Sequence, residues 1–277
     1  MCLNIFVFCT DERQRYLSQS LYGIKKSPDE SMKRQSDYNV WVLPTPLYKY
    51  DIAILNERFQ KEIVTGSNIA FAGAVNETWR DYFCKNNIEF IDFMQSEKVS
   101  LANAEVTAEA TLMLYIANSK LCVCGQKIIV SGYGRCGRLI AEKFAALGAK
   151  VTVMARNKAA RKQAVSDGHN AVTFSYGPQE AYGTAALINT VPSPVISDLI
   201  LSELHKECLL IEIASAPGGF DMEAVNKNHL RYIEAPGLPS KYLQKSGGRI
   251  IADYINRFVK TRFENGVGSV WIYQVSP

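Results

Sequence analysis

The sequence predicts an α/β protein with a doubly wound parallel sheet and a second, smaller parallel α/β domain at its N-terminus. The main observation is a strand, a glycine-rich turn, a helix and a second strand in direct succession between Lys127 and Asn157. A dinucleotide-binding unit requires this order. Short apolar runs alternate with helical patterns before and after that segment, which is typical of parallel sheets.

The glycine-rich turn carries most of the functional prediction. It reads Gly132-Tyr133-Gly134-Arg135-Cys136-Gly137. Gly132 should make the tight turn out of the strand, Gly134 should let the backbone approach a pyrophosphate, and Gly137 should let the helix pack closely on the sheet. N–H groups at the start of the helix would face the phosphates, and Gly148 would end the helix. The alternative is a glycine turn that binds no ligand.

The end of the second strand indicates which dinucleotide binds. NAD-preferring sites usually carry Asp or Glu there, about 20 residues after the glycines, to bind the ribose 2′-OH. This chain has Ala155-Arg156-Asn157. No carboxylate is present to repel a 2′-phosphate, and Arg156 could pair with one, so we expect NADP. The alternative is that Arg156 stacks on the adenine or faces solvent.

Length and composition limit the possible classes. A chain of 277 residues with 47% hydrophobic and 21% charged residues is ordinary for a soluble protein of two domains or one large one. The small net charge of +4 is not clustered and does not favour nucleic acid. Seven cysteines without paired spacing predict neither a disulfide framework nor a metal site. We recognise no signal peptide or membrane span and expect a cytoplasmic protein.

Residues 1–102 are predicted to form the smaller α/β domain. Four apolar runs read as strands, at Asn4 to Cys9, Val40 to Leu43, Ile69 to Ala72 and Ile88 to Phe93. They alternate with a helical stretch from Asp11 to Tyr22 and with a helix that Asn76 should cap. This alternation favours a small parallel sheet.

Residues 103–245 are predicted to form the dinucleotide-binding domain, beginning with a connecting helix capped by Asn103. Six apolar runs match the strand number of a full Rossmann sheet: 127–131, 150–155, 171–174, 185–189, 208–213 and 231–234. Helical stretches are predicted at Lys158 to Asp167, Val195 to Leu204 and Met222 to Asn228. Residues 246–277 should supply a last helix, Gly247 to Phe263, that packs back on the N-terminal domain.

Three loops after the last three strands of that sheet are rich in Pro and Gly. They are Asn189 to Ser193, Ala214 to Gly219 and Ala235 to Pro239. Ligands of a Rossmann sheet bind beyond the carboxyl ends of its strands, so we expect these loops to border the site. The predicted cofactor contacts are Thr190, Val191, Pro192 and Ala214, and the predicted substrate contacts are Ser215 and Gly237. Ordinary turn chemistry is the alternative for each loop.

Several segments together resemble one known family. They are Asn103 to Glu109, Gly132 to Gly137, Phe144 to Ala149, Ala155-Arg156, Pro217 to Gly219, Ala235 to Pro239 and Lys245 to Gly248. They are similar to the A subunit of dipicolinate synthase, with a good likeness from residue 103 to 255 and a thin one before that. The family's first turn usually reads Gly-Gly-Asp-x-Arg. Here Cys9 and Thr10 replace both glycines, whereas Asp11 and Arg13 match.

The resemblance implies an oxidoreductase of spore-forming bacteria that makes dipicolinate from dihydrodipicolinate with a flavoprotein-like B subunit. We also expect a homo-oligomer. One alternative is a nucleotide-binding partner subunit that is not itself catalytic. Another is a 2-hydroxyacid dehydrogenase, which has a similar architecture but needs a catalytic His. We expect surface positions for His169, His205 and His229, and none of them follows the last predicted strand.

The substrate is expected in a cleft between the first domain and the sheet edge that carries the three loops. Lys245 and Ser246, in the loop entering the last helix, are the predicted catalytic residues, and Lys245 would pair with a dicarboxylate or carry a proton. A solvated lysine and a helix-capping serine are the alternatives. Asn103 and Thr107 share one helix face and would bind the same ligand. Glu109 lies about 200° around that helix from Thr107 and should face elsewhere.

Overall fold

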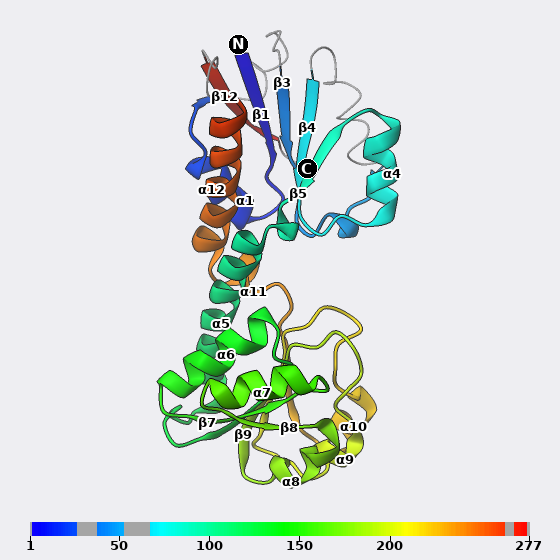
Figure 1. Ribbon diagram of the computed structural model, residues 1–277, viewed down its shortest axis with the longest axis vertical. Coiled ribbons are helices and arrows are strands. Elements are labelled where there is room, and N and C mark those ends of the chain that lie inside the picture. Colours follow the sequence, from blue (N-terminus) through cyan, green and yellow to red (C-terminus); the bar gives the residue numbers. More distant parts are fainter. Residues whose placement is uncertain (1, 27–37, 53–66, 264–268, 276–277) are drawn as a thin grey trace. The chain divides into compact units, whose positions relative to one another are not determined.

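A computed structural model describes residues 2–26, 38–52, 67–263 and 269–275 (Figure 1). The chain forms two compact units. The first comprises Met1–Ala102 and Leu243–Pro277, and the second is Asn103–Tyr242. Each unit contains one sheet in which every pair of neighbouring strands is parallel. The α/β class expected from the sequence is therefore confirmed.

The sheet of the first unit has the order β2-β12-β1-β3-β4-β5. Its strands are β1 (Cys2–Phe8), β2 (Ile24–Lys26), β3 (Tyr38–Val42), β4 (Ser67–Ala72), β5 (Glu89–Asp92) and β12 (Ser269–Val275). Strands β1, β3, β4 and β5 correspond to the four predicted apolar runs. Strands β2 and β12 were not predicted from the sequence, and β12 pairs with β1 over the full length of both strands.

Both faces of this sheet are covered by helices, which explains why its strands are apolar on both sides. Leu3, Ile5 and Val7 of β1 share one core with α1 (Glu12–Ser20) and α12 (Gln244–Phe263). Phe6 and Phe8 point the other way, into a core that includes Trp79 and Phe83 of α4 (Glu77–Lys85). Asn76 caps α4 as predicted, because its side chain accepts a hydrogen bond of 3.2 Å from the Trp79 N–H.

Helix α12 packs directly on α1. A Cβ at Gly248 would lie 2.5 Å from the Arg13 carbonyl oxygen and 2.7 Å from the Leu17 nitrogen, so the two helix backbones approach closely at this glycine. The helix begins at Gln244. The prediction that Lys245 and Ser246 lie in a preceding loop is therefore wrong, since both occupy its first turn.

The sheet of the second unit has the order β11-β10-β9-β6-β7-β8. Its strands are β6 (Lys127–Ser131), β7 (Lys150–Met154), β8 (Asn170–Val172), β9 (Thr184–Asn189), β10 (Leu209–Glu212) and β11 (Arg231–Glu234). Numbered within this unit, the strand order is that of the Rossmann fold. All six predicted strands are present within one or two residues of their expected ends.

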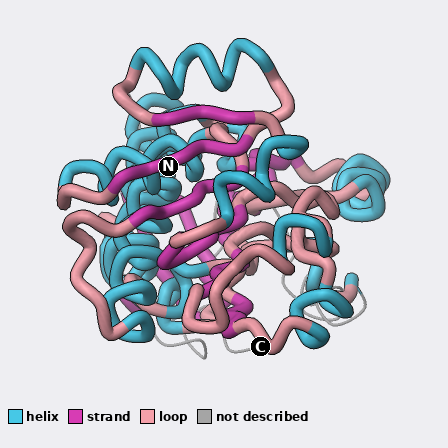
Figure 2. The backbone as a smooth tube through the Cα atoms, turned by 90° about the horizontal axis from the view of Figure 1, so that it is seen from below, coloured by secondary structure: helices cyan, strands magenta, loops and turns pink. Residues whose placement is uncertain are grey.

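Helices cover both faces of this second sheet as well (Figure 2). One face packs on α8 (Gly177–Ala181), α9 (Asp198–Leu201) and α10 (Met222–Lys227). Ile128 and Val130 alternate with Ile129 and point to the other face, on which α6 (Arg135–Ala146) lies. Helix α7 (Lys158–Ser166) connects β7 to β8.

Two helix predictions in this unit need correction. Helix α9 has four residues instead of the expected ten. The N–H groups of Val195 and Ile196 bond to the Gly219 carbonyl, and Ile196 forms a parallel bridge with Phe220, so this segment is a loop and not the start of a helix. The connecting helix α5 (Glu97–Ser119) starts six residues before Asn103. Asn103 is therefore an interior residue and not the helix cap.

Candidate functional site

The carboxyl ends of five strands lie level in the second unit. The strand registers align Met154 with Ser131, Ser131 with Asn189, Asn189 with Glu212, and Glu212 with Glu234. We call these five residues the strand-end row. The glycine turn and the three predicted loops all leave the sheet from this row. The fold therefore brings the predicted cofactor residues of the turn and of these loops to one edge.

Gly132 and Gly137 hold the turn in shape. Gly132 has a φ of +93°, and a Cβ there would lie 2.5 Å from Thr190 Oγ1 and 2.8 Å from Val191 Cγ2. A Cβ at Gly137 would collide with the Gly132 carbonyl oxygen. Gly132 thus makes the turn as expected, and Gly137 lets helix α6 pack against the turn itself.

Gly134 lies beside open space at the start of α6. It is the N-cap of this twelve-residue helix, and no atom lies within 4 Å of the position that a Cβ would take. The first N–H groups of a helix have no partner within the helix and attract anions. Arg135 and Cys136 form the first turn, where burial raises the pKa of the Cys136 thiol. The residues present fit a dinucleotide phosphate at this end of α6.

The Tyr133 side chain contacts the end of α7. Its hydroxyl donates a hydrogen bond of 2.7 Å to Asp167 at the end of α7, and its ring meets the His169 ring edge-on at 6.1 Å. Burial and the bond to Asp167 raise the pKa of the Tyr133 hydroxyl. His169 is only 7% exposed, so the expectation of a surface position is wrong for this histidine. Tyr133 ties the glycine turn to α7 through its side chain.

The segment after β7 is shaped by Arg161. Its guanidinium donates hydrogen bonds of 2.6 Å to the carbonyl oxygens of both Ala155 and Arg156. The Asn157 side chain caps α7 by accepting from the Ala159 N–H at 2.7 Å. Ala155 is buried and Arg156 is exposed. The guanidinium of Arg156 is thus accessible at the end of β7, where no carboxylate stands.

Thr190 joins the loop after β9 to the glycine turn. Its N–H and its hydroxyl both donate to the Ser131 carbonyl, at 3.0 and 2.8 Å. Val191 and Pro192 follow, and the Asn189 side chain closes this loop by donating to the Val191 carbonyl and accepting from the Val191 N–H. Thr190 and Val191 therefore lie against Gly132, next to the start of α6.

Glu212 holds the loop that follows β10. It was not predicted from the sequence as a site residue. Glu212 is 3% exposed, and its carboxylate accepts from the Asn189 amide at 2.7 Å, the Ala214 N–H at 3.0 Å and the Gly219 N–H at 2.7 Å. Burial raises the pKa of this carboxyl, while the hydrogen bonds oppose that shift. A Glu as the last residue of a buried strand was the only available signal. Its contacts hold Ala214 and Gly219 in place, while Ser215, between them, is exposed.

The loop after β11 is held by the same strand end. The Ala235 N–H donates to the Glu212 carbonyl at 2.8 Å. Gly237 has a φ of +72° and precedes the short helix α11 (Leu238–Lys241). Gly237 is exposed, so it can border a ligand at this edge.

The predicted residues of α5 have contacts within that helix or with the neighbouring helix α6. The Thr107 hydroxyl is buried and donates to the Asn103 carbonyl at 2.8 Å. Glu109 faces elsewhere, as its position on the helix predicts, and lies 3.4 Å from Lys143 of α6 in an ion pair. Lys245 and Ser246 belong to the other unit, where both are exposed at the start of α12.

In the first turn of the chain, the sequence differs from the family pattern. The two residues that do match the pattern there, Asp11 and Arg13, make structural contacts. Asp11 caps α1 by accepting from the Gln14 N–H at 2.9 Å. Arg13 is 6% exposed and donates to the Thr45 carbonyl at 2.7 Å. Burial lowers the pKa of the Arg13 guanidinium. Both matching residues thus serve the fold of the first unit.

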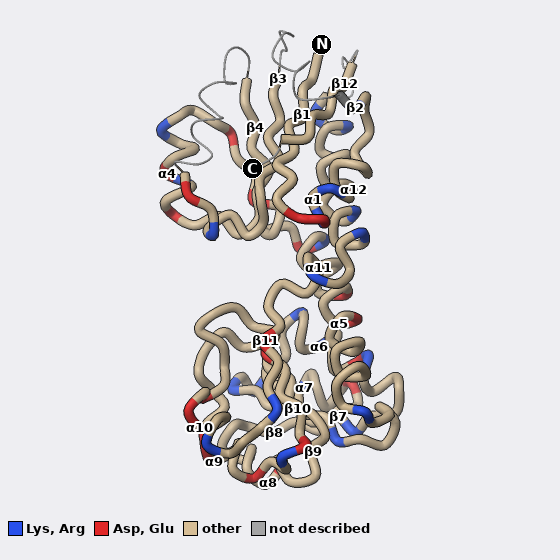
Figure 3. Tube along the Cα trace, turned by 180° about the vertical axis from the view of Figure 1, so that it is seen from behind, with Lys and Arg blue, Asp and Glu red and all other residues tan. Residues whose placement is uncertain are grey.

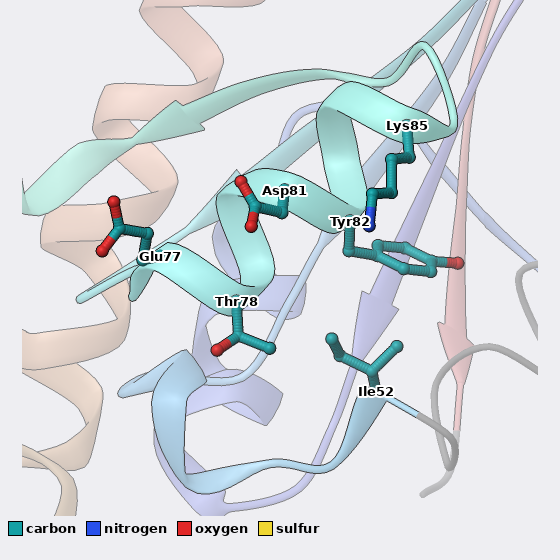
Figure 4. A pocket seen from close by; sticks show the side chains of 6 residues that line it. All are labelled: Ile52, Glu77, Thr78, Asp81, Tyr82 and Lys85. Carbon is teal, nitrogen blue, oxygen red and sulfur yellow. The ribbon is translucent and has the colours of Figure 1, made fainter.

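A surface pocket lies apart from the strand-end row. A pocket on α4 is lined by Ile52, Glu77, Thr78, Asp81, Tyr82 and Lys85, and it contains no predicted site residue (Figure 4).

Lys and Arg are interspersed with Asp and Glu along both units (Figure 3). Within the described ranges, no cluster of His, Cys, Asp and Glu could hold a metal ion, and no helix is long and apolar enough to span a membrane.

Comparisons with known proteins show similar sequences and folds. The A subunit of dipicolinate synthase from Bacillus subtilis is 28% identical over 191 residues, which are 69% of this chain and 64% of that protein. The structure of the corresponding A subunit from Bacillus halodurans superposes with a TM-score of 0.76 and 26% identity, covering 93% of this chain and 97% of that one. The chain resembles the dipicolinate synthase A subunit in sequence and in fold. The resemblance expected from the sequence is confirmed.

Further comparisons concern the fold. The A chain of dipicolinate synthase from Bacillus subtilis superposes with a TM-score of 0.75 at 22% identity, over 94% of this chain and 96% of that one. D-lactate dehydrogenase from Escherichia coli superposes with a TM-score of 0.58 at 9% identity, over 97% of this chain and 99% of that one. No family model matches the chain. In sequence, the match spans somewhat less than two thirds of the curated dipicolinate synthase relative.

Proposed function

We propose that this chain is an NADP-dependent oxidoreductase that converts dihydrodipicolinate to dipicolinate, as a dipicolinate synthase A subunit would during sporulation. One observation carries the proposal. At one sheet edge, open space at the start of α6 adjoins Gly134, and an accessible arginine follows β7 where NAD-preferring sites have a carboxylate. The likeness to two dipicolinate synthase A structures supports the substrate.

Each group at this edge has a proposed task. N–H groups at the start of α6 bind the pyrophosphate, and Arg156 pairs with the 2′-phosphate of the adenosine ribose. Thr190 and Val191, which lie against Gly132, the following Pro192, and Ala214, which Glu212 holds, border the nicotinamide. When bound, NADP⁺ supplies the hydride acceptor. The row of strand ends therefore serves binding and orientation.

Oxidation of dihydrodipicolinate to the aromatic dicarboxylate removes one hydride and one proton. The hydride goes to the nicotinamide and the proton must pass to a base or to water. We assign Lys245 to the substrate, either as the partner of a carboxylate or as the proton carrier, with Ser246 beside it. The location of Lys245 in the first turn of α12, exposed to solvent, leaves its amine accessible.

One observation favours a second candidate, a nucleotide-binding subunit whose flavoprotein-like B partner performs the redox step. Within the described strand-end row, Glu212 is the one buried carboxylate, and it is fully engaged with Asn189, Ala214 and Gly219. His169 is buried against Tyr133, and His205 and His229 follow helices, not strand ends. The other carboxylate of the row, Glu234, is exposed, so the row offers no buried acid or base beside Glu212.

The purified chain by itself, given dihydrodipicolinate and NADP⁺, distinguishes these candidates. Formation of reduced nicotinamide, with dipicolinate as the product, supports the enzyme. Activity that requires addition of the B subunit supports the second candidate. Tight binding of NADP(H) without turnover under either condition would contradict both. A 2-hydroxyacid dehydrogenase would instead oxidise 2-hydroxy acids, which we expect the chain to leave unchanged because it lacks a suitable histidine.

A further inference from the structure

A cavity of about 490 Å³ lies where the strands of the second sheet begin, at the other edge from the strand-end row. The first residues of three neighbouring strands line it, Lys127 of β6, Lys150 of β7 and Asn170 of β8. Glu180 of α8 and His169, which precedes β8, also line it. We call this cavity the amino-edge pocket. Its volume is in the range of small-molecule sites, and it includes no residue of the proposed nucleotide or substrate site.

Two lysines of the amino-edge pocket are neighbours. Lys127 and Lys150 are aligned across β6 and β7, so their side chains leave the same face of the sheet. Glu180 pairs with the Lys127 ammonium at 3.0 Å. Lys150 is exposed, and within the part of the chain that the structure describes it forms no ion pair. Two ammonium groups on adjacent strands repel each other, and an anion between them removes that repulsion.

Hydrogen bonds beside the lysines are long. The Thr152 hydroxyl, buried in the middle of β7, accepts from the Asn170 amide at 3.4 Å and donates to the Glu180 carboxylate at 3.4 Å. A hydroxyl and an oxygen acceptor normally lie about 2.7–2.8 Å apart, so this network is weakly closed. The Asn170 amide and the Lys150 ammonium are therefore donors that the protein itself does not use fully.

His169 gives an independent indication of a ligand. It lines the same pocket and is 7% exposed, yet its Nε2 atom has no hydrogen-bond partner among the described residues. Buried polar side-chain atoms are rarely left unpaired, and each exception requires an explanation such as a water, an ion or a ligand. The ring of His169 also contacts Tyr133 edge-on, so the pocket adjoins a side chain of the glycine turn.

We propose that the amino-edge pocket binds a small anion that carries a carboxylate or a phosphate group. Lys150 pairs with this group and the Asn170 amide donates to it, because charge-assisted hydrogen bonds to such oxygens are strong. Lys127 adds positive charge, while its pairing with Glu180 fixes its position. Two cations against one carboxylate favour a negatively charged ligand. This site is separate from the proposed function and does not depend on it.

The chain contains only three histidines, which makes the pocket observable by NMR of their rings. The purified full-length chain is titrated with inorganic phosphate and separately with succinate, at constant pH and with ionic strength held constant by sodium chloride. The His169 signals should shift and saturate with a dissociation constant of about 1 mM, whereas the exposed His205 and His229 should show no saturating shift. The anion that binds more tightly identifies the group that the ligand carries.

Variants of Lys150 test whether the anion lies in the pocket. Lys150→Gln should weaken binding about tenfold, and Lys150→Arg, which keeps the charge, should retain most of the affinity. Lys162→Gln removes another exposed lysine, on α7 and outside the pocket lining, and should have no effect. Circular dichroism should show all three variants folded, since each replaces an exposed side chain.

Two results would overturn the proposal. One is the absence of a saturating His169 shift below about 20 mM of either anion. The other is a saturating shift that Lys150→Gln leaves unchanged. Because Tyr133 of the glycine turn contacts His169, such a shift would instead indicate an anion at the start of α6.

Discussion

The side-chain amide of Asn189 donates a hydrogen bond of 2.7 Å to the carboxylate of Glu212, joining the carboxyl ends of strands β9 and β10. Both side chains are buried, and each also bonds to the backbone of the loop that follows its own strand. Gly219 must be a glycine here, because a Cβ would lie 2.6 Å from the Asn189 side-chain carbonyl carbon. One polar pair thus sets two of the loops at the candidate site.

Replacing Glu212 by Gln should destabilise the protein by about 1–3 kcal/mol, because an amide NH₂ would face N–H donors that now meet a carboxylate. Urea unfolding followed by circular dichroism measures the change. Glu203→Gln, an exposed carboxylate on the same unit, is the control and should have little effect. Equal stability of both variants would contradict the role assigned to Glu212.

Two glycines of the turn should respond differently to alanine. Gly137→Ala should lower the melting temperature, because its Cβ would collide with the Gly132 carbonyl. Gly134→Ala should leave the melting temperature unchanged, because open space surrounds that position, yet it should weaken NADP(H) binding about tenfold or more by obstructing the phosphates. Thermal melts and fluorescence titration test this pair. A Gly134→Ala variant that binds nucleotide normally would argue against a phosphate there.

Arg156 should distinguish the two nicotinamide cofactors. The parent is expected to bind NADP(H) more tightly than NAD(H), and Arg156→Ala should cost about 1.5–3 kcal/mol for NADP(H) while leaving NAD(H) nearly unchanged. Calorimetric titration with both cofactors measures this difference. Lys158→Ala removes another exposed cation two residues away and serves as the control. An equal loss for both cofactors, or a parent that prefers NAD(H), would remove the basis for NADP.

Lys245 should affect the substrate and leave the nucleotide unaffected. Lys245→Met is expected to weaken binding of dipicolinate, used as a product analogue, because a positive charge that would face the carboxylates is lost. NADP(H) affinity should stay the same. Lys260→Met, an exposed lysine on the same helix, is the control. If Lys245→Met binds dipicolinate as well as the parent does, the assignment of Lys245 to the substrate is wrong.

Tyr133 should make stability depend on alkaline pH. Burial and the bond to Asp167 raise the pKa of its hydroxyl in the folded state, so its stabilisation is complete below the ordinary tyrosine pKa. The stabilisation is then lost as the pH rises through the raised value. Tyr133→Phe should cost about 1 kcal/mol near neutral pH. The difference from the parent should shrink above about pH 10.

Urea unfolding of the parent and of Tyr133→Phe across this alkaline range tests the prediction. Tyr176→Phe is the control, since Tyr176 is 62% exposed, and its effect should be small at every pH. A difference between the parent and Tyr133→Phe that stays constant throughout the range would show that the hydroxyl is not held in its neutral form by the fold.

Local sequence patterns were sufficient for the second unit's sheet and for the glycine turn. Its six strands are short apolar runs. The structural roles of Gly132, Gly137 and Gly148 in the turn and at the helix end follow from backbone geometry within a few residues. Gly148 has a φ of +83° and ends α6 as expected. Such features depend on neighbours in the sequence, so periodicity and glycine spacing predict them.

Other features depend on residues that are distant in the chain, and only the tertiary structure decided them. Strand β12 forms a ladder with β1, whose residues precede it by more than 260 positions, and nothing within β12 indicates that partner. Glu212 meets Asn189 only because β9 and β10 are adjacent with their ends in register. The bond from Tyr133 to Asp167 exists because the glycine turn and the end of α7 lie side by side. The sequence determined most of the strands of both sheets and the glycine turn. Packing determined which polar groups face one another, because a buried donor must bond to whichever acceptor the fold brings within reach.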